Sequence, residues 1–172
     1  MDTVFGDDVV KLDWRTAAAA SRAVLAGMSP RSRYLRFHAG MPSILRRLQG
    51  QEGGVDGIVH AALGLRVGAE WVGIARCVRT APGQAEISVA VVDRWQGLGA
   101  GRALLTAMRD HATALGYHQL SADVLDENAA ALALLSSVFC VDARTASAGV
   151  VSLELSAGTR VDCPGGAVPL AS

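Results

Sequence analysis

Gln96-Gly97-Leu98-Gly99-Ala100-Gly101 is the most informative segment of this 172-residue chain. Residues 87–92, directly before it, are mostly β-branched and have the length of a strand. Residues 102–115, after it, carry apolar side chains at helical spacing. The glycines therefore form a strand-to-helix turn, where the first backbone N–H groups of the helix lack intrahelical partners. Such a turn admits a ligand close to the backbone and favours an anion, so a phosphate-bearing ligand is predicted.

Two well-known phosphate-binding turns fit this stretch poorly. A P-loop needs Lys and then Ser or Thr after its last glycine, and Arg102 followed by an alanine excludes it. A dinucleotide fingerprint matches Gly97 and Gly99 but has Arg102 in place of its third glycine. With Asp123 or Asp126 as the acid that binds a ribose, this second interpretation is weakened but stays open.

A third signature fits in full. Gln96, Gly99 and Gly101 match the Gln/Arg-x-x-Gly-x-Gly/Ala pattern of acyl-CoA-dependent acyltransferases. A glycine turn that binds no ligand is the remaining interpretation, because short glycine motifs are weak evidence by themselves.

Composition predicts one ordinary globular domain. The chain is 51% hydrophobic and 19% charged, with 16 basic and 16 acidic residues, so no electrostatic argument favours nucleic acid as a partner. No signal-peptide pattern and no apolar run long enough for a membrane span is present, which predicts a cytoplasmic protein without a membrane partner. The cysteines lack zinc-ligand spacing, so no metal is expected. We expect a single domain over residues 1–155 and a flexible tail over residues 156–172, which are rich in Gly, Ala and Pro.

The order of predicted elements indicates a mixed α/β sheet. Strands are expected over residues 9–14, 57–65, 71–78, 84–92, 118–125, 138–143 and 150–155. Helices are expected over residues 16–28, from Ser29-Pro30 onward, over 41–49, from the glycine turn to Gly116, and over 126–137. This order predicts a mostly antiparallel sheet with one parallel βαβ unit, whose ligand site lies at the carboxyl ends of the strands.

The chain resembles the GCN5-related N-acetyltransferase (GNAT) superfamily over roughly residues 9–155. The most specific segment is 86–105, and residues 123–128 resemble the segment that carries an Asn near the CoA arm. Residues 29–37 resemble the early helix of bacterial protein-lysine acetyltransferase GNAT domains. The resemblance implies the GNAT fold, with a parallel βαβ acyl-CoA site, and an N-acetyltransferase that moves acetyl from acetyl-CoA directly to an amine. It leaves the acceptor open between a protein lysine and a small molecule.

The resemblance also implies a cofactor site. The pantetheine arm would pair with backbone groups of the strand before the glycine turn, and the pyrophosphate would lie on the amides of the turn itself. Arg102 would add a positive charge, and Asn128 would either contact CoA or cap the following helix. The implied cofactor-binding residues are Val89, Ala90, Val91, Gln96, Gly97, Leu98, Gly99, Ala100, Gly101, Arg102 and Asn128.

Glu86 is the candidate catalytic residue. An amine of the lysine type has a pKa of about 10.4, so it must lose a proton before it can attack a thioester. A carboxylate on an interior strand is a suitable general base, and strand alternation places Glu86 on the face of Ser88 and Ala90. The resemblance implies this role, while a Glu at a hairpin mouth that faces solvent is the alternative. The N–H of Val91 is the expected donor to the oxyanion.

Two departures from the family pattern leave room for other functions. The helix over residues 126–137 has no Tyr to protonate the leaving thiolate, so Ser136 or Ser137 would have to substitute, or the thiolate leaves unassisted. Val138 precedes Phe139 where the family has Gly. A non-catalytic acyl-CoA-binding regulatory module is therefore the main alternative, and a nicotinamide-dependent oxidoreductase the weaker one. Exposed strands near the C-terminus are compatible with a homodimer.

Overall fold

A computed structural model describes residues 5, 8–37 and 54–157 of the chain. Seven strands form one mixed sheet in the order β1-β2-β3-β4-β5-β7-β6, in which only β4 and β5 pair in parallel. This confirms the predicted fold class. The strands are β1 Val9–Lys11, β2 His60–Val67, β3 Glu70–Ala81, β4 Gln84–Val91, β5 Gln119–Leu125, β6 Cys140–Ser147 and β7 Val150–Ser156.

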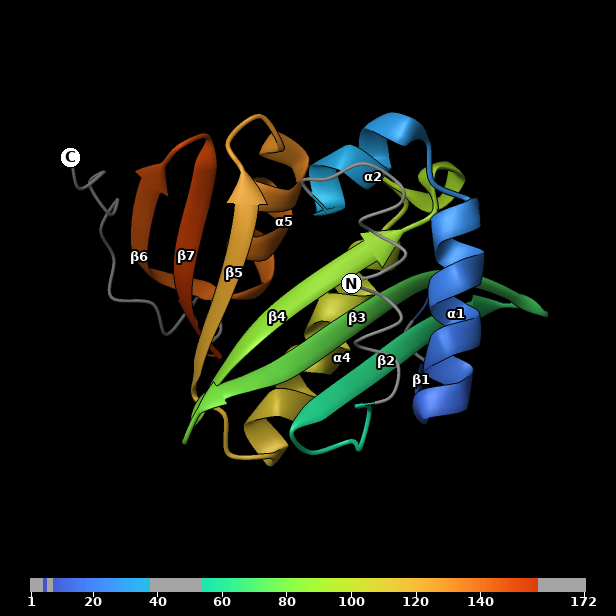
Figure 1. Cartoon of the computed structure of the whole chain (residues 1–172), viewed down its shortest axis with the longest axis horizontal. Coiled ribbons are helices and arrows are strands. Elements are labelled where there is room, and N and C mark those ends of the chain that lie inside the picture. The colour runs from blue at the N-terminus through green and yellow to red at the C-terminus, as the bar shows by residue number, and fades with distance from the viewer. Residues whose placement is uncertain (1–4, 6–7, 38–53, 158–172) are drawn as a thin grey trace.

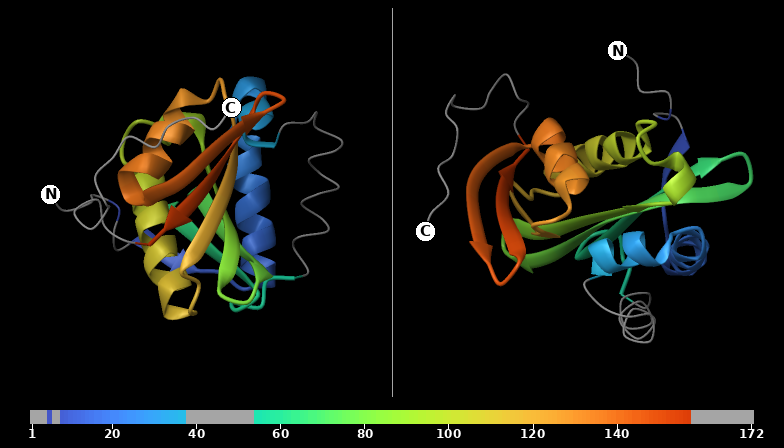
Figure 2. Two further views of the ribbon diagram at one scale, coloured as in Figure 1. Left: turned by 90° about the vertical axis from the view of Figure 1, so that its left-hand side faces the viewer. Right: turned by 90° about the horizontal axis from the view of Figure 1, so that it is seen from above.

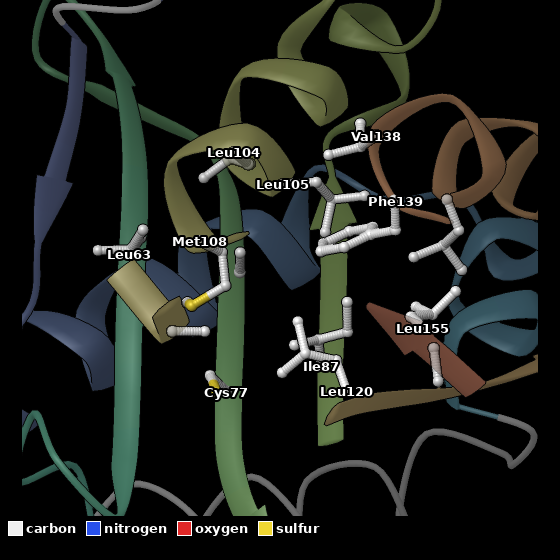
Figure 3. Packing of buried hydrophobic residues seen from close by; sticks show 14 of the residues in the cluster. Leu63, Cys77, Ile87, Leu104, Leu105, Met108, Leu120, Val138, Phe139 and Leu155 are labelled. Atoms are coloured by element: carbon white, nitrogen blue, oxygen red, sulfur yellow. The ribbon is translucent and has the colours of Figure 1, made fainter. Parts of the chain in front are cut away.

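Helices cover both faces of the sheet (Figure 2). Helices α1 (Trp14–Ala26) and α2 (Pro30–Phe37) lie on one face, and α4 (Ala100–Ala114) and α5 (Ala129–Val138) lie on the other. A short 3-10 helix, η2 (Asp93–Trp95), connects β4 to the glycine turn. The larger core lies between the sheet and α4, where Figure 3 shows Phe139 next to Leu105. No helix among the described residues is long and apolar enough to span a membrane.

Side-chain caps and glycines set the helix boundaries. At the start of α1, Oδ1 of Asp13 accepts a hydrogen bond from the N–H of Thr16 at 2.8 Å, and Oγ1 of Thr16 accepts one from the N–H of Asp13. At the start of α2, Oγ of Ser29 accepts a hydrogen bond from the N–H of Ser32, as the Ser-Pro signal predicts. Helix α4 ends just before Gly116, whose φ of +83° is the left-handed conformation expected after a helix.

Several predicted boundaries were displaced. The first strand ends at Lys11 instead of residue 14, because the Asp13 side chain caps α1, which begins at Trp14. Strands β3 and β6 continue to Ala81 and Ser147, three and four residues past their predicted ends.

Strand β2 begins at His60 because Oδ1 of Asp56 accepts hydrogen bonds from the N–H groups of Ile58 and His60, which turns the chain first. Helix α5 begins three residues later than predicted because Asn128 caps it. It also continues through Val138, so β6 starts only at Cys140. The helix predicted over residues 41–49 and most of the predicted tail lie outside the described residues.

The parallel pair is short, and this shapes the site. Strands β4 and β5 are paired only where Gln84, Ala85 and Glu86 face Gln119, Leu120 and Ser121. Beyond this point the two strands separate toward their carboxyl ends, as Figure 1 shows. Strand β5 remains paired with β7 along its whole length, so the sheet opens at one seam only.

The buried His60 makes the stability of this fold depend on pH. Its Nε2 lies 3.0 Å from Nη1 of Arg76, and because a guanidinium can only donate, this nitrogen accepts and the ring is neutral. Burial lowers the pKa of His60, the charge of Arg76 lowers it further, and Asp56 opposes both. Between the folded pKa and the ordinary value of about 6.5, the unfolded chain binds more protons than the folded one.

We therefore expect the free energy of unfolding to be greatest above about pH 6.5 and to fall as the pH drops below it. Urea unfolding at about pH 7.5 and about pH 5.5 measures this difference. His60→Gln keeps an acceptor for Arg76 but does not titrate, so it should flatten the dependence in part. Part of the pH dependence should remain in this variant, because burial also lowers the pKa of His111. A variant with the same pH dependence as the wild type would contradict this role for His60.

Candidate functional site

A cleft of about 580 Å³ opens at the seam between β4 and β5. Its floor is the carboxyl-terminal half of β4, and the glycine turn and first turn of α4 close one end. Helix α5 and the middle of β5 form one wall, and α2 forms part of the other. The described residues that line it are Met28, Ser32, Leu35, Arg36, Glu86, Ile87, Ser88, Val89, Ala90, Val91, Gln96, Gly97, Gly99, Gly101, Arg102, Ala122, Asp123, Val124, Asn128, Ala130, Ala131, Ala133, Leu134, Leu135 and Ser137.

The edge of β4 that faces the cleft carries backbone groups without a strand partner. The N–H of Val92 donates to the carbonyl oxygen of Val72 at 2.9 Å. Val92 and Val72 therefore form one of the hydrogen-bonded residue pairs between β3 and β4. Because such pairs alternate along an antiparallel ladder, Ala90 also directs its backbone groups at β3. Val89 and Val91 direct theirs at the side from which β5 has diverged. Three residues were predicted to contact pantetheine. The backbone groups of Val89 and Val91 face the cleft, whereas Ala90 lines the cleft with its side chain only.

The glycine turn presents free amides to one end of the cleft. Gly97 and Gly99 have φ of +73° and +94°, and a Cβ at either would meet nothing within 4 Å. Gly99 is the N-cap of α4 without a side-chain cap, and the first helical bond runs from Ala103 to its carbonyl. The N–H groups of residues 99–102 therefore have no intrahelical partner, which makes this helix end an anion site.

The remaining residues predicted to bind the cofactor differ in whether they line the cleft. Gly101 has ordinary helical geometry, but a Cβ there would lie 2.8 Å from Cδ2 of Leu134, so it permits close packing of α4 on α5. Arg102 is exposed and lines the cleft. The side chain of Leu98 is 57% exposed and that of Ala100 is fully buried, and neither lines the cleft. Both can contribute only their backbone amides.

Glu86 lies at the level where the pairing of β4 with β5 ends. Its side chain shares a sheet face with Ser88 and Ala90, as alternation predicts, and lines the cleft. The carboxyl group is exposed and has no ion-pair or hydrogen-bond partner among the described residues. A carboxylate placed in this way can take a proton from a molecule that enters the cleft beside Ser88.

Asn128 caps α5, which confirms the structural role considered for it. Its Oδ1 accepts a hydrogen bond of 3.2 Å from the N–H of Ala131. Its side-chain NH₂ group has no partner among the described residues, and Asn128 also lines the cleft. One side chain can therefore cap the helix and donate to a ligand at the same time.

Helix α2 makes polar contacts on both sides of the cleft. Arg31 lies 3.5 Å from Glu127 in the connection between β5 and α5. On the other side, Asp93 accepts hydrogen bonds from Ser29 and Ser32. Burial raises the pKa of Asp93, but these hydrogen bonds and the charge of Arg33 outweigh burial, so its pKa lies below the ordinary value. Helix α2 is thus linked both to η2, which leads into the glycine turn, and to the connection between β5 and α5.

A comparison with protein-family models adds a decisive observation. Residues 36–138 match the model described as the acetyltransferase (GNAT) family. The chain belongs to the GNAT family. It is accordingly an acyltransferase. No curated protein sequence matches the chain closely enough to name a relative.

Solved structures of other GNAT proteins share the fold. The GNAT domain of S. lividans PAT is 23% identical, with a TM-score of 0.74 over 86% of this chain and 89% of that one. The structure of yncA, a putative acetyltransferase from Salmonella typhimurium with its cofactor acetyl-CoA, is 23% identical, with a TM-score of 0.60 over 87% and 93%. The ribosomal-protein-S18-alanine N-acetyltransferase from Escherichia coli is 19% identical, with a TM-score of 0.59 over 86% and 90%.

Helix α2, the segment that resembles the early helix of protein-lysine acetyltransferase GNAT domains, also contributes to this GNAT cleft. Ser32, Leu35 and Arg36 reach it from α2, which is more than fifty residues before the glycine turn in the sequence. Helix α5 contributes mostly small apolar side chains, which read as ordinary core residues. In the part of the chain that the structure describes, no group of three or more His, Cys, Asp or Glu side chains is placed to hold a metal.

The two serines considered as thiolate partners differ in position. Ser137 lines the cleft, and its Oγ donates a hydrogen bond of 2.7 Å to the carbonyl of Leu134. Ser136 is exposed, does not line the cleft, and donates to the carbonyl of Leu132. Only Ser137 can therefore approach a ligand in the cleft.

Proposed function

We propose that this GNAT protein transfers an acetyl group from acetyl-CoA directly to an amine. The observation that carries the proposal is the single cleft in which an unpaired strand edge leads to an uncapped helix N-terminus. The edge suits an extended amide-bearing arm, and the helix end suits a pyrophosphate. CoA has these two parts in this order, whereas NAD lacks the amide-bearing arm.

The proposed cofactor position uses the backbone more than side chains. The pantetheine arm pairs with Val89 and Val91 as an added strand would. The pyrophosphate accepts hydrogen bonds from the amides of residues 99–102, with Arg102 adding positive charge at the rim of the cleft. The side-chain NH₂ of Asn128 donates to the arm from the α5 side.

Glu86 acts as the general base in the proposed reaction. It takes a proton from the ammonium form of the acceptor, directly or through water, and the neutral amine attacks the thioester carbonyl. The N–H of Val91 stabilises the oxyanion of the tetrahedral intermediate. As the intermediate collapses, the C–S bond breaks, the amide forms and CoA leaves as a thiolate, while the second proton of the attacking nitrogen passes through water to the departing sulfur. Thiols have a pKa of about 8.5, so water can protonate the thiolate without a tyrosine.

The structure offers no nucleophilic cysteine for a two-step route among its described residues with a free thiol. Cys77 is buried in the core, and burial raises its pKa to about 11. A direct transfer between acetyl-CoA and the amine is therefore the simpler proposal. The acceptor enters on the side of α2, beside Ser88, and is either a lysine side chain of a protein or a small-molecule amine.

Calorimetric titration with acetyl-CoA, CoA and NAD tests the cofactor assignment. We expect micromolar binding of acetyl-CoA and CoA and no binding of NAD, because only CoA can use both the strand edge and the helix end. Release of CoA in the presence of a panel of primary amines and lysine-containing peptides then identifies the acceptor class. Binding of NAD without binding of acetyl-CoA would overturn the proposal and favour an oxidoreductase.

A further inference from the structure

We propose that Gln96 is a positioning residue for acetyl-CoA, which acts on the thioester arm through Val91 and does not contact the pyrophosphate. This inference rests on the proposed function, since it assigns a role within the same cleft. Gln96, the first residue of the glycine signature, then orients the thioester arm, whereas the amides of the following turn bind the pyrophosphate.

The side chain of Gln96 folds back onto the strand that precedes the turn. Its Nε2 donates a hydrogen bond of 2.9 Å to the carbonyl oxygen of Val91 and lies 3.4 Å from Oδ1 of Asp93. A side-chain amide has two N–H donors, so both are directed at acceptors within the protein. Neither is left for an anion at the amides of the turn.

The bond to Val91 replaces a strand contact that the open seam removes. Val91 is 9% exposed, and its cleft-facing carbonyl has no partner in β5 because the two strands have already separated. The other end of the same peptide unit, the N–H of Val92, is bound to the carbonyl of Val72. Gln96 therefore completes the anchoring of the last peptide of β4 and prevents this strand end from fraying.

The same bond decides which groups β4 offers to a ligand. With one lone pair of its carbonyl taken by Gln96, Val91 presents its N–H as its one backbone group without a partner among the described residues, while Val89 presents both an N–H and a carbonyl. A thioester oxygen can only accept hydrogen bonds and thus suits Val91, whereas the amides of pantetheine both donate and accept and suit Val89. Gln96 thereby fixes the register in which the arm pairs with the strand.

Asp93 keeps Gln96 in this conformation. Its carboxylate receives the second donor of Gln96 and hydrogen bonds from Ser29 and Ser32 at the start of α2. Its own N–H donates to the carbonyl of Gly27 at 3.3 Å. Because Asp93 is held from several sides, the Gln96 side chain has a fixed acceptor that opposes rotation toward the turn.

Titration of variants with two ligands tests this role. The first ligand is acetyl-CoA, and the second is adenosine 3′-phosphate 5′-diphosphate, which keeps the pyrophosphate but lacks the pantetheine arm. We expect Gln96→Ala to bind acetyl-CoA about tenfold more weakly, the loss of one well-formed hydrogen bond, and to bind the fragment like the wild type. Gln96→Glu, which has the same size but directs an acceptor at the Val91 carbonyl, should weaken acetyl-CoA binding at least as much.

Gln119→Ala is the matched control, because it truncates an exposed glutamine that accepts a hydrogen bond from Gln84 and does not line the cleft. It should bind both ligands as the wild type does. Hydrogen exchange gives a second measurement: the amide of Val92 should exchange faster in Gln96→Ala than in the wild type. An equal loss for both ligands would overturn the proposal in favour of a direct pyrophosphate contact, and an unchanged affinity for both would also overturn it. A wild type that binds no acetyl-CoA would instead refute the proposed function.

Discussion

Glu86→Gln is expected to lower kcat by about 10²- to 10⁴-fold, the usual contribution of a general base, while leaving the affinity for acetyl-CoA unchanged. Glutamine keeps the size and polarity of the side chain but cannot take a proton at neutral pH. Glu86 lies where the β4–β5 pairing ends, on the acceptor side of the strand, whereas the predicted cofactor contacts lie farther along β4 and in the glycine turn. The measurement is the rate of CoA release with the best amine from the panel, together with calorimetric Kd values for acetyl-CoA.

Glu154→Gln is the control for this prediction. Ser121 on β5 is paired with Glu86 of β4 on one side and with Glu154 of β7 on the other. Glu154 is also an exposed carboxylate, but it does not line the cleft. Its replacement should leave both turnover and binding unchanged. Full activity of Glu86→Gln would remove Glu86 from the mechanism. A wild type that binds acetyl-CoA but transfers acetyl to no amine would favour an acyl-CoA-binding module.

Gly99→Val is expected to weaken acetyl-CoA binding by about 10- to 100-fold, because the anion site depends on a left-handed residue at the helix N-cap. The φ of Gly99 is +94°, a conformation that costs an L-residue about 1–2 kcal/mol and a β-branched residue more. A Cβ there would meet no atom within 4 Å, so the strain is conformational and is relieved only if the turn changes shape. A changed turn no longer directs the amides of residues 99–102 at one point. Calorimetry with acetyl-CoA measures the loss.

Gly149→Val separates the loss of the site from a general loss of stability. Gly149 has φ of +78° in the turn between β6 and β7, also with open space around a Cβ, and does not line the cleft. The two variants should therefore lose similar unfolding free energy in urea, but only Gly99→Val should lose affinity for acetyl-CoA. If both variants bind acetyl-CoA equally, the conformation of the glycine turn is not what holds the cofactor.

Much of the fold could be predicted because its signals are local. Caps, glycines and the period of apolar residues act within a few positions, and they placed α1, α2, α4 and the hairpin strands within a few residues. The boundaries that were displaced depend on single side-chain hydrogen bonds, such as those of Asp56 and Asn128. The side-chain periodicity of two correctly placed Glu86 on the face of Ser88 and Ala90, before any contact between strands is known.

The site was less accessible from the sequence because it depends on contacts across the chain. The register of β4 on β3 decides that Val89 and Val91, and not Ala90, direct their backbone groups at the cleft. The residue at which β4 and β5 cease to pair cannot be inferred from their sequences, and yet the separation of the two strands beyond it forms the cleft. The resemblance drew attention to residues 29–37, but which of their side chains reach the cleft depends on how α2 packs against the sheet.

From the amino-acid sequence alone we could infer a mixed α/β chain, a glycine turn at a helix N-terminus, a family signature and a carboxylate that shares a strand face with Ser88. These follow from local conformational preferences and from side-chain periodicity, which a single chain expresses without its neighbours. Three features become visible only in the folded chain: the opening of the sheet at one seam, the backbone groups that line this seam, and the hydrogen bond from Gln96 to the carbonyl of Val91. Hydrogen-bond partners between strands are set by register and packing, and these exist only once the whole sheet has formed.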